Sequence, residues 1–60
     1  MRKYITATSA RKNFFTLLDL AEKPGNEIVI TRGGLPRIVL ISFERFEKMK
    51  EEVLKKLRRK

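Results

Sequence analysis

The chain has 60 residues, of which 15 are lysine or arginine and seven are aspartate or glutamate, so its net charge is +8. A chain of this length forms one domain, and it buries only about 60% of the surface of its unfolded state, so its core is marginal. Cysteine and histidine are both absent, which excludes disulfides and the common zinc sites. A second copy of the chain is the remaining way to add buried surface, and the positive charge is typical of proteins that bind nucleic acids.

The sequence shows no targeting signal and no membrane segment. Its longest apolar run, residues 38–41, is far too short to cross a bilayer. The basic residues Arg2 and Lys3 are not followed by the apolar stretch of a secretory signal. We therefore expect a cytoplasmic protein with no membrane partner.

The first predicted elements are a short strand and a helix. Residues 4–6, Tyr-Ile-Thr, favour a strand, and Thr8 is a candidate N-cap for a helix over about residues 9–23. Apolar residues at helical spacing mark the face of this helix that we expect to be buried: Ala10, Phe14, Leu17, Leu18 and Ala21. Phe15 and Leu20 lie off the centre of that stripe, which indicates a second buried surface such as a subunit contact.

A β-hairpin is predicted next. Pro24-Gly25-Asn26 ends the helix. Two β-branched runs, residues 27–32 and 37–43, then flank Gly33-Gly34, where the chain can adopt positive φ and reverse. Pro36 is expected before the ladder begins, where its missing amide costs little.

From Ser42 the apolar spacing becomes helical again, and Ser42 is a candidate N-cap. The apolar face of this last helix consists of Phe46, Met49, Val53, Leu54 and Leu57. The order β, α, β, β, α predicts an α+β domain, in which one helix packs on a small antiparallel or mixed sheet built around the hairpin and the C-terminal helix projects. We expect a homodimer with residues 1–43 as its DNA-binding domain and residues 44–60 as an amphipathic contact helix.

The residue inventory argues against an enzyme. The chain has no histidine to act as a general base and no cysteine nucleophile. Its carboxylates are scattered, and the pair Asp19 and Glu22 on one helical turn is typical of a solvated surface. Gly33-Gly34 lacks the spacing of a phosphate-binding loop. We therefore expect no catalytic residue, no cofactor and no metal.

Two groups of residues are candidate DNA contacts. The first group lies at the start of the first helix and comprises Thr8, Arg11, Lys12 and Asn13. Free amides at a helix N-terminus suit a phosphate, arginine pairs with guanine, asparagine with adenine, and lysine with phosphate. The second group is Arg32 and Arg37 on either side of the hairpin turn. Taken singly, each of these residues also has a simpler interpretation as solvated surface.

The apolar face of the last helix has three interpretations. It packs in the core or against a second copy, it docks in a groove of another protein, or it lies on a membrane. The glutamates of this segment and the absence of tryptophan argue against the membrane.

The sequence resembles the Phd/YefM antitoxins of bacterial toxin–antitoxin operons. Three stretches in order carry the resemblance, which covers about residues 3–50: residues 5–14 (ITATSARKNF), residues 28–33 (IVITRG), and Pro36 followed by residues 39–42 (VLIS). The resemblance implies an α+β homodimer that binds a palindromic operator and represses its operon, with Arg11 and Arg32 as the DNA readers. It also implies that the region after the hairpin binds and neutralises a toxin.

The chain departs from the family pattern near the hairpin and in the last helix. Leu35 and Gly33 stand where family members often have basic residues, and Arg37 is a candidate to compensate. The family's toxin-binding region is commonly acidic, whereas residues 55–60 read KKLRRK.

We therefore favour a sequence-specific operator-binding repressor that also binds a toxin. The alternative is a protein-interaction module that binds a partner through the last helix without specific DNA binding. A module that binds single-stranded RNA is less favoured, because the phenylalanines occupy apolar periodic positions and are not expected to be free to stack on bases.

Overall fold

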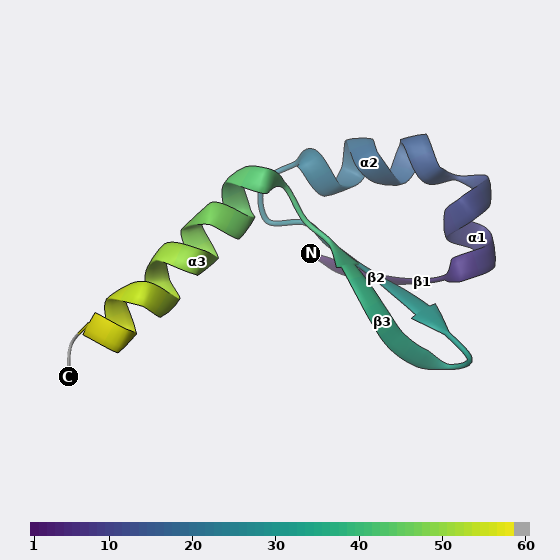
Figure 1. The fold of residues 1–60 in the computed structure, drawn as a ribbon. Helices are drawn as coiled ribbons and strands as arrows, with labels where there is room; N and C mark the ends of the chain where they lie inside the picture. The colour runs from purple at the N-terminus through teal and green to yellow at the C-terminus, as the bar shows by residue number, and fades with distance from the viewer. Residues whose placement is uncertain (59–60) are drawn as a thin grey trace.

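The computed structural model describes residues 1–58, which form a small sheet with three helices (Figure 1). In chain order the elements are β1 (Arg2–Thr6), α1 (Ala7–Lys12), α2 (Phe14–Glu22), β2 (Glu27–Arg32), β3 (Leu35–Leu40) and α3 (Phe43–Arg58). The structure is therefore of the α+β class, as the sequence predicted. In these residues no helix has the length and apolar character needed to cross a membrane.

The prediction of a single helix over residues 9–23 is wrong, because the chain breaks at Asn13 into α1 and α2. Asn13 has φ −120° and ψ 30°, outside the helical range. Its side-chain amide donates to the Ser9 carbonyl at 3.0 Å, and its backbone N–H donates to the same oxygen at 3.1 Å. The Asn13 carbonyl in turn accepts from the Leu17 amide at 3.0 Å. Asparagine favours such ends because its side chain competes for backbone groups.

The first helix also begins earlier than predicted, with Thr6 as its N-cap in place of Thr8. Thr6 is extended, with φ −72° and ψ 155°, and its hydroxyl accepts from the Ser9 amide at 3.2 Å. Thr8 lies inside α1 and is exposed. The helix starts early because α1 follows β1 with no linker, so the last strand residue is also the cap.

Thr6→Ala should therefore lower the free energy of unfolding by about 1 kcal/mol, since an amide at the helix start loses its partner. Thr8→Ala is the matched control and should change stability by less than about 0.5 kcal/mol, because it removes an exposed hydroxyl from a helix interior. Denaturant unfolding followed by circular dichroism measures both. Equal unfolding midpoints for the two variants would contradict the assignment of Thr6 as the cap.

The strand order in the sheet is β1-β2-β3, and the sheet is mixed. β3 runs antiparallel to β2, with Val29 opposite Val39, but β1 runs parallel to β2, with Tyr4 opposite Val29. Of the two predicted arrangements, antiparallel or mixed, the sheet is therefore the mixed one, because β1 is parallel to β2. The reason is the α1–α2 connection, which crosses over and returns the chain to the same end of the sheet from which β1 started.

The β2–β3 connection is a two-residue turn at Gly33 and Gly34, whose φ values are 61° and 77°. Positive φ at both positions is the requirement of the tight turn whose twist suits adjoining strands. The pairing then shifts by one residue, since Thr31 faces Pro36 whereas Ile30 faces Ile38. Pro36 thus lies within β3 and not before the ladder as predicted. It is tolerated there because β3 is an edge strand.

The core lies between one face of the sheet and the two short helices. Ala10, Leu17, Ala21 and Ile28 are buried, and four apolar residues pack against them: Ile5, Leu20, Ile30 and Leu40. The stripe prediction holds for Ala10, Leu17 and Ala21.

The remaining aromatic and leucine positions of this region differ from the prediction. Phe14 is 46% exposed and was expected inside, whereas Leu20 packs against the core and was expected off the stripe. Phe15 is 79% exposed, and its ring meets that of Phe14 edge-on at 5.9 Å. The break at Asn13 separates the two helices, so Phe14 no longer continues the apolar face that Ala10 begins.

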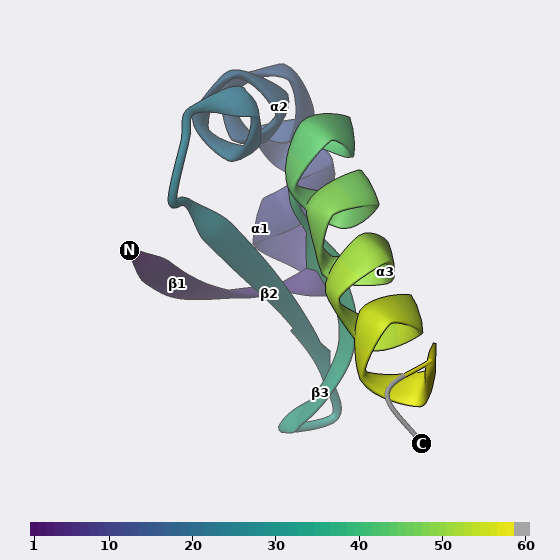
Figure 2. The same ribbon diagram turned by 90° about the vertical axis from the view of Figure 1, so that its left-hand side faces the viewer.

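α3 begins as predicted, with the Ser42 hydroxyl accepting from the Arg45 amide at 3.1 Å. In Figure 1 the helix extends away from the sheet and from α1 and α2, and Figure 2 shows it from that side, in front of them. None of its residues is buried through Arg58, where its description ends. The last helix therefore projects, as the sequence predicted.

Candidate nucleic-acid interface and the projecting helix

The topology brings the two predicted groups of DNA contacts to one end of the sheet. β1 and β2 are parallel, with Thr6 opposite Thr31, so both strands finish at the same end of the sheet, where β1 leads into α1 and β2 leads into the hairpin turn (Figure 1). The Thr31 hydroxyl donates to the Ile5 carbonyl at 3.4 Å and joins these two strand ends. Arg32 and Arg37 flank the turn, and α1 starts beside it.

A hollow at this end is lined by two arginines and three apolar residues: Arg32, Arg37, Ala7, Ile30 and Ile38. Arg37 is the extra residue of β3 where the β2–β3 register shifts. Such a bulge locally bends a strand and re-aims its side chain. The bulge therefore explains how Arg37 comes to share a hollow with Arg32, on the strand across the turn.

The α1 candidates lie on the helix that begins at this hollow. Thr8, Arg11 and Lys12 are exposed, and Arg11 and Lys12 follow Thr8 by three and four residues, so both lie one turn from Thr8 on its side of α1. The expectation that Arg11 and Lys12 lie near a helix N-terminus is wrong, because α1 has six residues and both lie in its last turn. Their charges complement the negative end of the helix dipole instead.

Asn13 is placed differently from the other candidates. Its side-chain amide is engaged in the Ser9 hydrogen bond that ends α1. A bidentate contact with adenine uses one N–H and the oxygen of the side-chain amide, and the amide nitrogen has two N–H groups. The bond to Ser9 therefore holds the amide at the end of α1 and is compatible with such a contact.

The acidic residues are segregated from this end of the molecule. Residues 1–18 and 28–43 contain basic residues but no aspartate or glutamate. These segments comprise β1, α1, most of β2, and β3. Lining clefts with charges of one sign concentrates the field there, so this end suits a polyanion.

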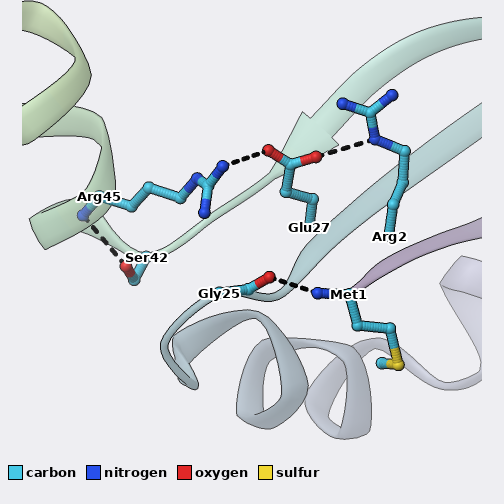
Figure 3. A network of polar contacts seen from close by, with 6 residues as sticks. All are labelled: Met1, Arg2, Gly25, Glu27, Ser42 and Arg45. Carbon is cyan, nitrogen blue, oxygen red and sulfur yellow. Dashed lines mark hydrogen bonds and ion pairs between the residues drawn. The ribbon is translucent and has the colours of Figure 1, made fainter.

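A second polar group, at the opposite end of the sheet, fixes the start of α3 (Figure 3). Arg2 Nε donates to Glu27 Oε1 at 2.8 Å, and Arg45 Nη2 donates to Glu27 Oε2 at 2.7 Å. The Met1 ammonium donates to the Gly25 carbonyl at 2.6 Å. Glu27, the first residue of β2, thus binds Arg2 of β1 and Arg45 of α3, which lie 25 and 18 residues away from it along the chain.

The charges of this group stabilise one another. The hydrogen bond from Arg2 lowers the pKa of the Glu27 carboxyl, with further contributions from the charges of Arg2, Arg45 and the N-terminus. The same bond raises the pKa of Arg2. The Glu27 side chain is 17% exposed, against 81% for Glu44 in its pair with Lys48. Sequence reasoning missed this group, because its members are distant along the chain.

Glu27→Gln should lower stability at neutral pH, because two arginines lose their carboxylate partner, and Glu44→Gln should have a much smaller effect as the exposed control. The pKa of Glu27 is lower in the folded state. Its contribution is therefore complete above the ordinary carboxyl pKa and is lost as the pH falls through the folded value. Thermal unfolding from pH 7 to pH 2 measures both effects. A stability difference between wild type and Glu27→Gln that did not shrink at acid pH would contradict the role of this carboxylate.

The predicted toxin or dimer contacts share the exposed face of α3. Phe46, Met49, Val53, Leu54 and Leu57 are 45–64% exposed. All of them except Leu57 line one shallow apolar patch together with Lys50, which sequence reasoning did not single out. Its signal was its spacing, four residues after Phe46 and three before Val53.

A groove that sequence reasoning also missed lies on the face of the sheet opposite the core. Its apolar lining comprises Tyr4, Val29, Pro36, Val39, Ile41 and Met49, with Arg2 and Glu27 at one side. Tyr4 and Val39 are 59% and 54% exposed. Side chains alternate along β2, so Ile28 faces the core and Val29 faces the groove. Tyr4 and Val39 are opposite Val29 on the two neighbouring strands, so they face the groove as well.

The family model described as antitoxin Phd_YefM, type II toxin–antitoxin system, matches residues 2–59. The match covers nearly the whole chain and places it in a class of regulatory proteins that act with a cognate toxin. The chain belongs to the Phd/YefM antitoxin family. Comparison with curated proteins found no match, and comparison with solved structures found none either.

Proposed function

We propose that this antitoxin represses its own toxin–antitoxin operon in the cytoplasm as a homodimer bound to a palindromic operator, and that it neutralises its cognate toxin through α3. The observation that carries the DNA-binding half is the convergence of α1 and the hairpin turn at one acid-free end of the sheet. Membership of the antitoxin family supports the toxin-binding half.

The proposed division of roles follows the chemistry of each side chain. Arg11 and Arg32 are the base readers, because a guanidinium forks onto guanine N7 and O6. Thr8, Lys12 and Arg37 contact phosphates and set the register, which supplies affinity without sequence information. Asn13, at the end of α1, is a further proposed base contact, because its amide can pair with adenine.

The proposed dimer explains why so small a chain exposes apolar groups on the face of the sheet opposite its core. A second copy seated on the groove beside Tyr4 and Val39 would remove these side chains from water. A symmetric dimer also presents two copies of the cationic end, which matches the symmetry of a palindromic site.

The alternative function is a protein-interaction module without specific DNA binding. One observation favours it, namely that α3 is a projecting amphipathic helix with no buried residue through Arg58. In that case Phe46→Ala or Leu54→Ala would abolish partner binding, and DNA affinity would be weak and independent of sequence.

The test of the proposed function is a titration of the protein against the upstream region of its own operon, over a salt series, with random duplex as competitor. We expect tight binding that resists competitor and weakens steeply with salt, by a logarithmic slope of about −0.9 for each phosphate neutralised. Equal, weak affinity for both duplexes would exclude the repressor and favour the interaction module.

A further inference from the structure

The apolar stripe of α3 contains a lysine near its centre. Lys50 is four residues after Phe46, three before Val53 and four before Leu54, so all of them lie on one helix face. It is the only charged residue among the five that line the apolar patch of α3, the others being Phe46, Met49, Val53 and Leu54. A partner that covers this patch must also cover Lys50.

The neighbours of Lys50 stabilise its ammonium only in part. Nζ lies 3.3 Å from a carboxylate oxygen of Glu47 and 5.9 Å from the centroid of the Phe46 ring. The Lys50 side chain is 54% exposed and the Glu47 side chain 43%. An ammonium has three N–H donors, and Glu47 can accept from one of them, so water serves the others while the patch is free.

Docking in a groove removes that water. A buried ammonium without enough acceptors is strongly unfavourable, and a positioned carboxylate compensates for the loss. We propose, on the basis of the toxin-binding function proposed above, that α3 docks in an apolar groove of the cognate toxin which presents a carboxylate to Lys50. The partner surface is thus apolar with an acidic group inside it.

Charge argues against a second copy of α3 packed in parallel and in register, because Lys50 would meet its own counterpart. Antiparallel packing brings one flank of each helix together, and this flank contains Glu44, Glu47 and Glu51 followed by Lys55 and Arg58, so its two ends attract each other. The toxin is preferred over this antiparallel pair because the chain belongs to an antitoxin family, and the self-association measurement below distinguishes the two occupants.

The test compares the affinity of the full chain for its purified cognate toxin, by calorimetry, between wild type, Lys50→Met and Lys50→Glu. Methionine keeps the apolar stem and helix propensity and removes only the charge. Lys48→Met and Lys48→Glu are matched controls, because Lys48 is also paired with a glutamate, Glu44 at 3.4 Å, but lies off the stripe and is 72% exposed. Helix content by circular dichroism confirms that each variant folds.

We expect Lys50→Met to weaken toxin binding by about 30-fold or more, since it leaves the toxin's carboxylate buried and unpaired. Lys50→Glu should weaken it further, and the Lys48 variants should stay within about threefold of wild type. The direction in which Lys50→Met changes toxin affinity is decisive. In a purely apolar groove this variant would bind the toxin as tightly as wild type or more tightly, and that result would overturn the proposal.

Two further outcomes overturn it differently. If wild type does not bind the toxin at all, the proposed neutralisation fails together with this inference. In the second outcome wild type binds the toxin, Lys50→Met leaves toxin affinity unchanged, and the variant self-associates more strongly than wild type in sedimentation equilibrium. A second copy then covers α3, and only the inference fails.

Discussion

Replacing Arg11 and Arg32 together by alanine is expected to weaken specific operator binding by about 2–6 kcal/mol, roughly 1–3 kcal/mol for each arginine. Each guanidinium can form two hydrogen bonds to one guanine, and alanine leaves those base acceptors without a partner. The range is the sum of the two single effects, since each guanidinium is proposed to pair with its own guanine. Titration of operator and random duplex at one fixed salt concentration measures the loss.

The matched control is Lys23→Ala with Lys48→Ala. This pair removes the same charge, but Lys23 follows α2 and Lys48 lies on α3, both outside the acid-free end of the sheet. The control should lower affinity for both duplexes slightly and leave their ratio unchanged. If the arginine variant and the control lost affinity equally for both duplexes, Arg11 and Arg32 would contribute only charge and would not be the readers.

Ile28→Ala is expected to destabilise the fold by about 2–5 kcal/mol, because it leaves a cavity beneath both short helices. Ile28 is 0% exposed and packs in the cluster with Leu17, Ala10 and Ala21. A domain of 60 residues has a total stability of only about 3–9 kcal/mol at typical values per residue. A large fraction of the variant should therefore be unfolded at 37 °C, with operator binding lost as a consequence.

Ile38→Ala is the control of the same residue type, on the neighbouring strand and 55% exposed. It should cost less than about 1 kcal/mol. Denaturant unfolding of both variants, monitored by circular dichroism, provides the comparison. Similar midpoints for the two variants would show that the core does not lie between the sheet and α1–α2.

Several features of this protein are determined by residues close together in the sequence. The hairpin turn follows from Gly33-Gly34, because only glycine adopts positive φ without strain at both positions. The start of α3 follows from Ser42, whose hydroxyl reaches an amide three residues ahead. The stripe of α3 follows from helical periodicity. These signals act over one turn or one strand, so they can be interpreted without knowing the rest of the fold.

The direction of β1 was decided only by the tertiary structure. It depends on how α1 and α2 return the chain, because a strand can pair in either direction locally and long-range packing decides between the two. The break at Asn13 is local, since its side chain and its backbone N–H both donate to the Ser9 carbonyl four residues back, but the continuous apolar periodicity of the segment concealed it.

The site shows the same division. The sequence by itself determined the residue types, namely the arginines beside the turn and on the first helix and the absence of acidic residues around them. Only the fold decided that Arg37 joins Arg32 in one hollow through a bulge, and that Glu27 joins Arg2 to Arg45. The physical reason is that charge and periodicity belong to the chain, whereas a contact between distant residues exists only after strand pairing has brought them together.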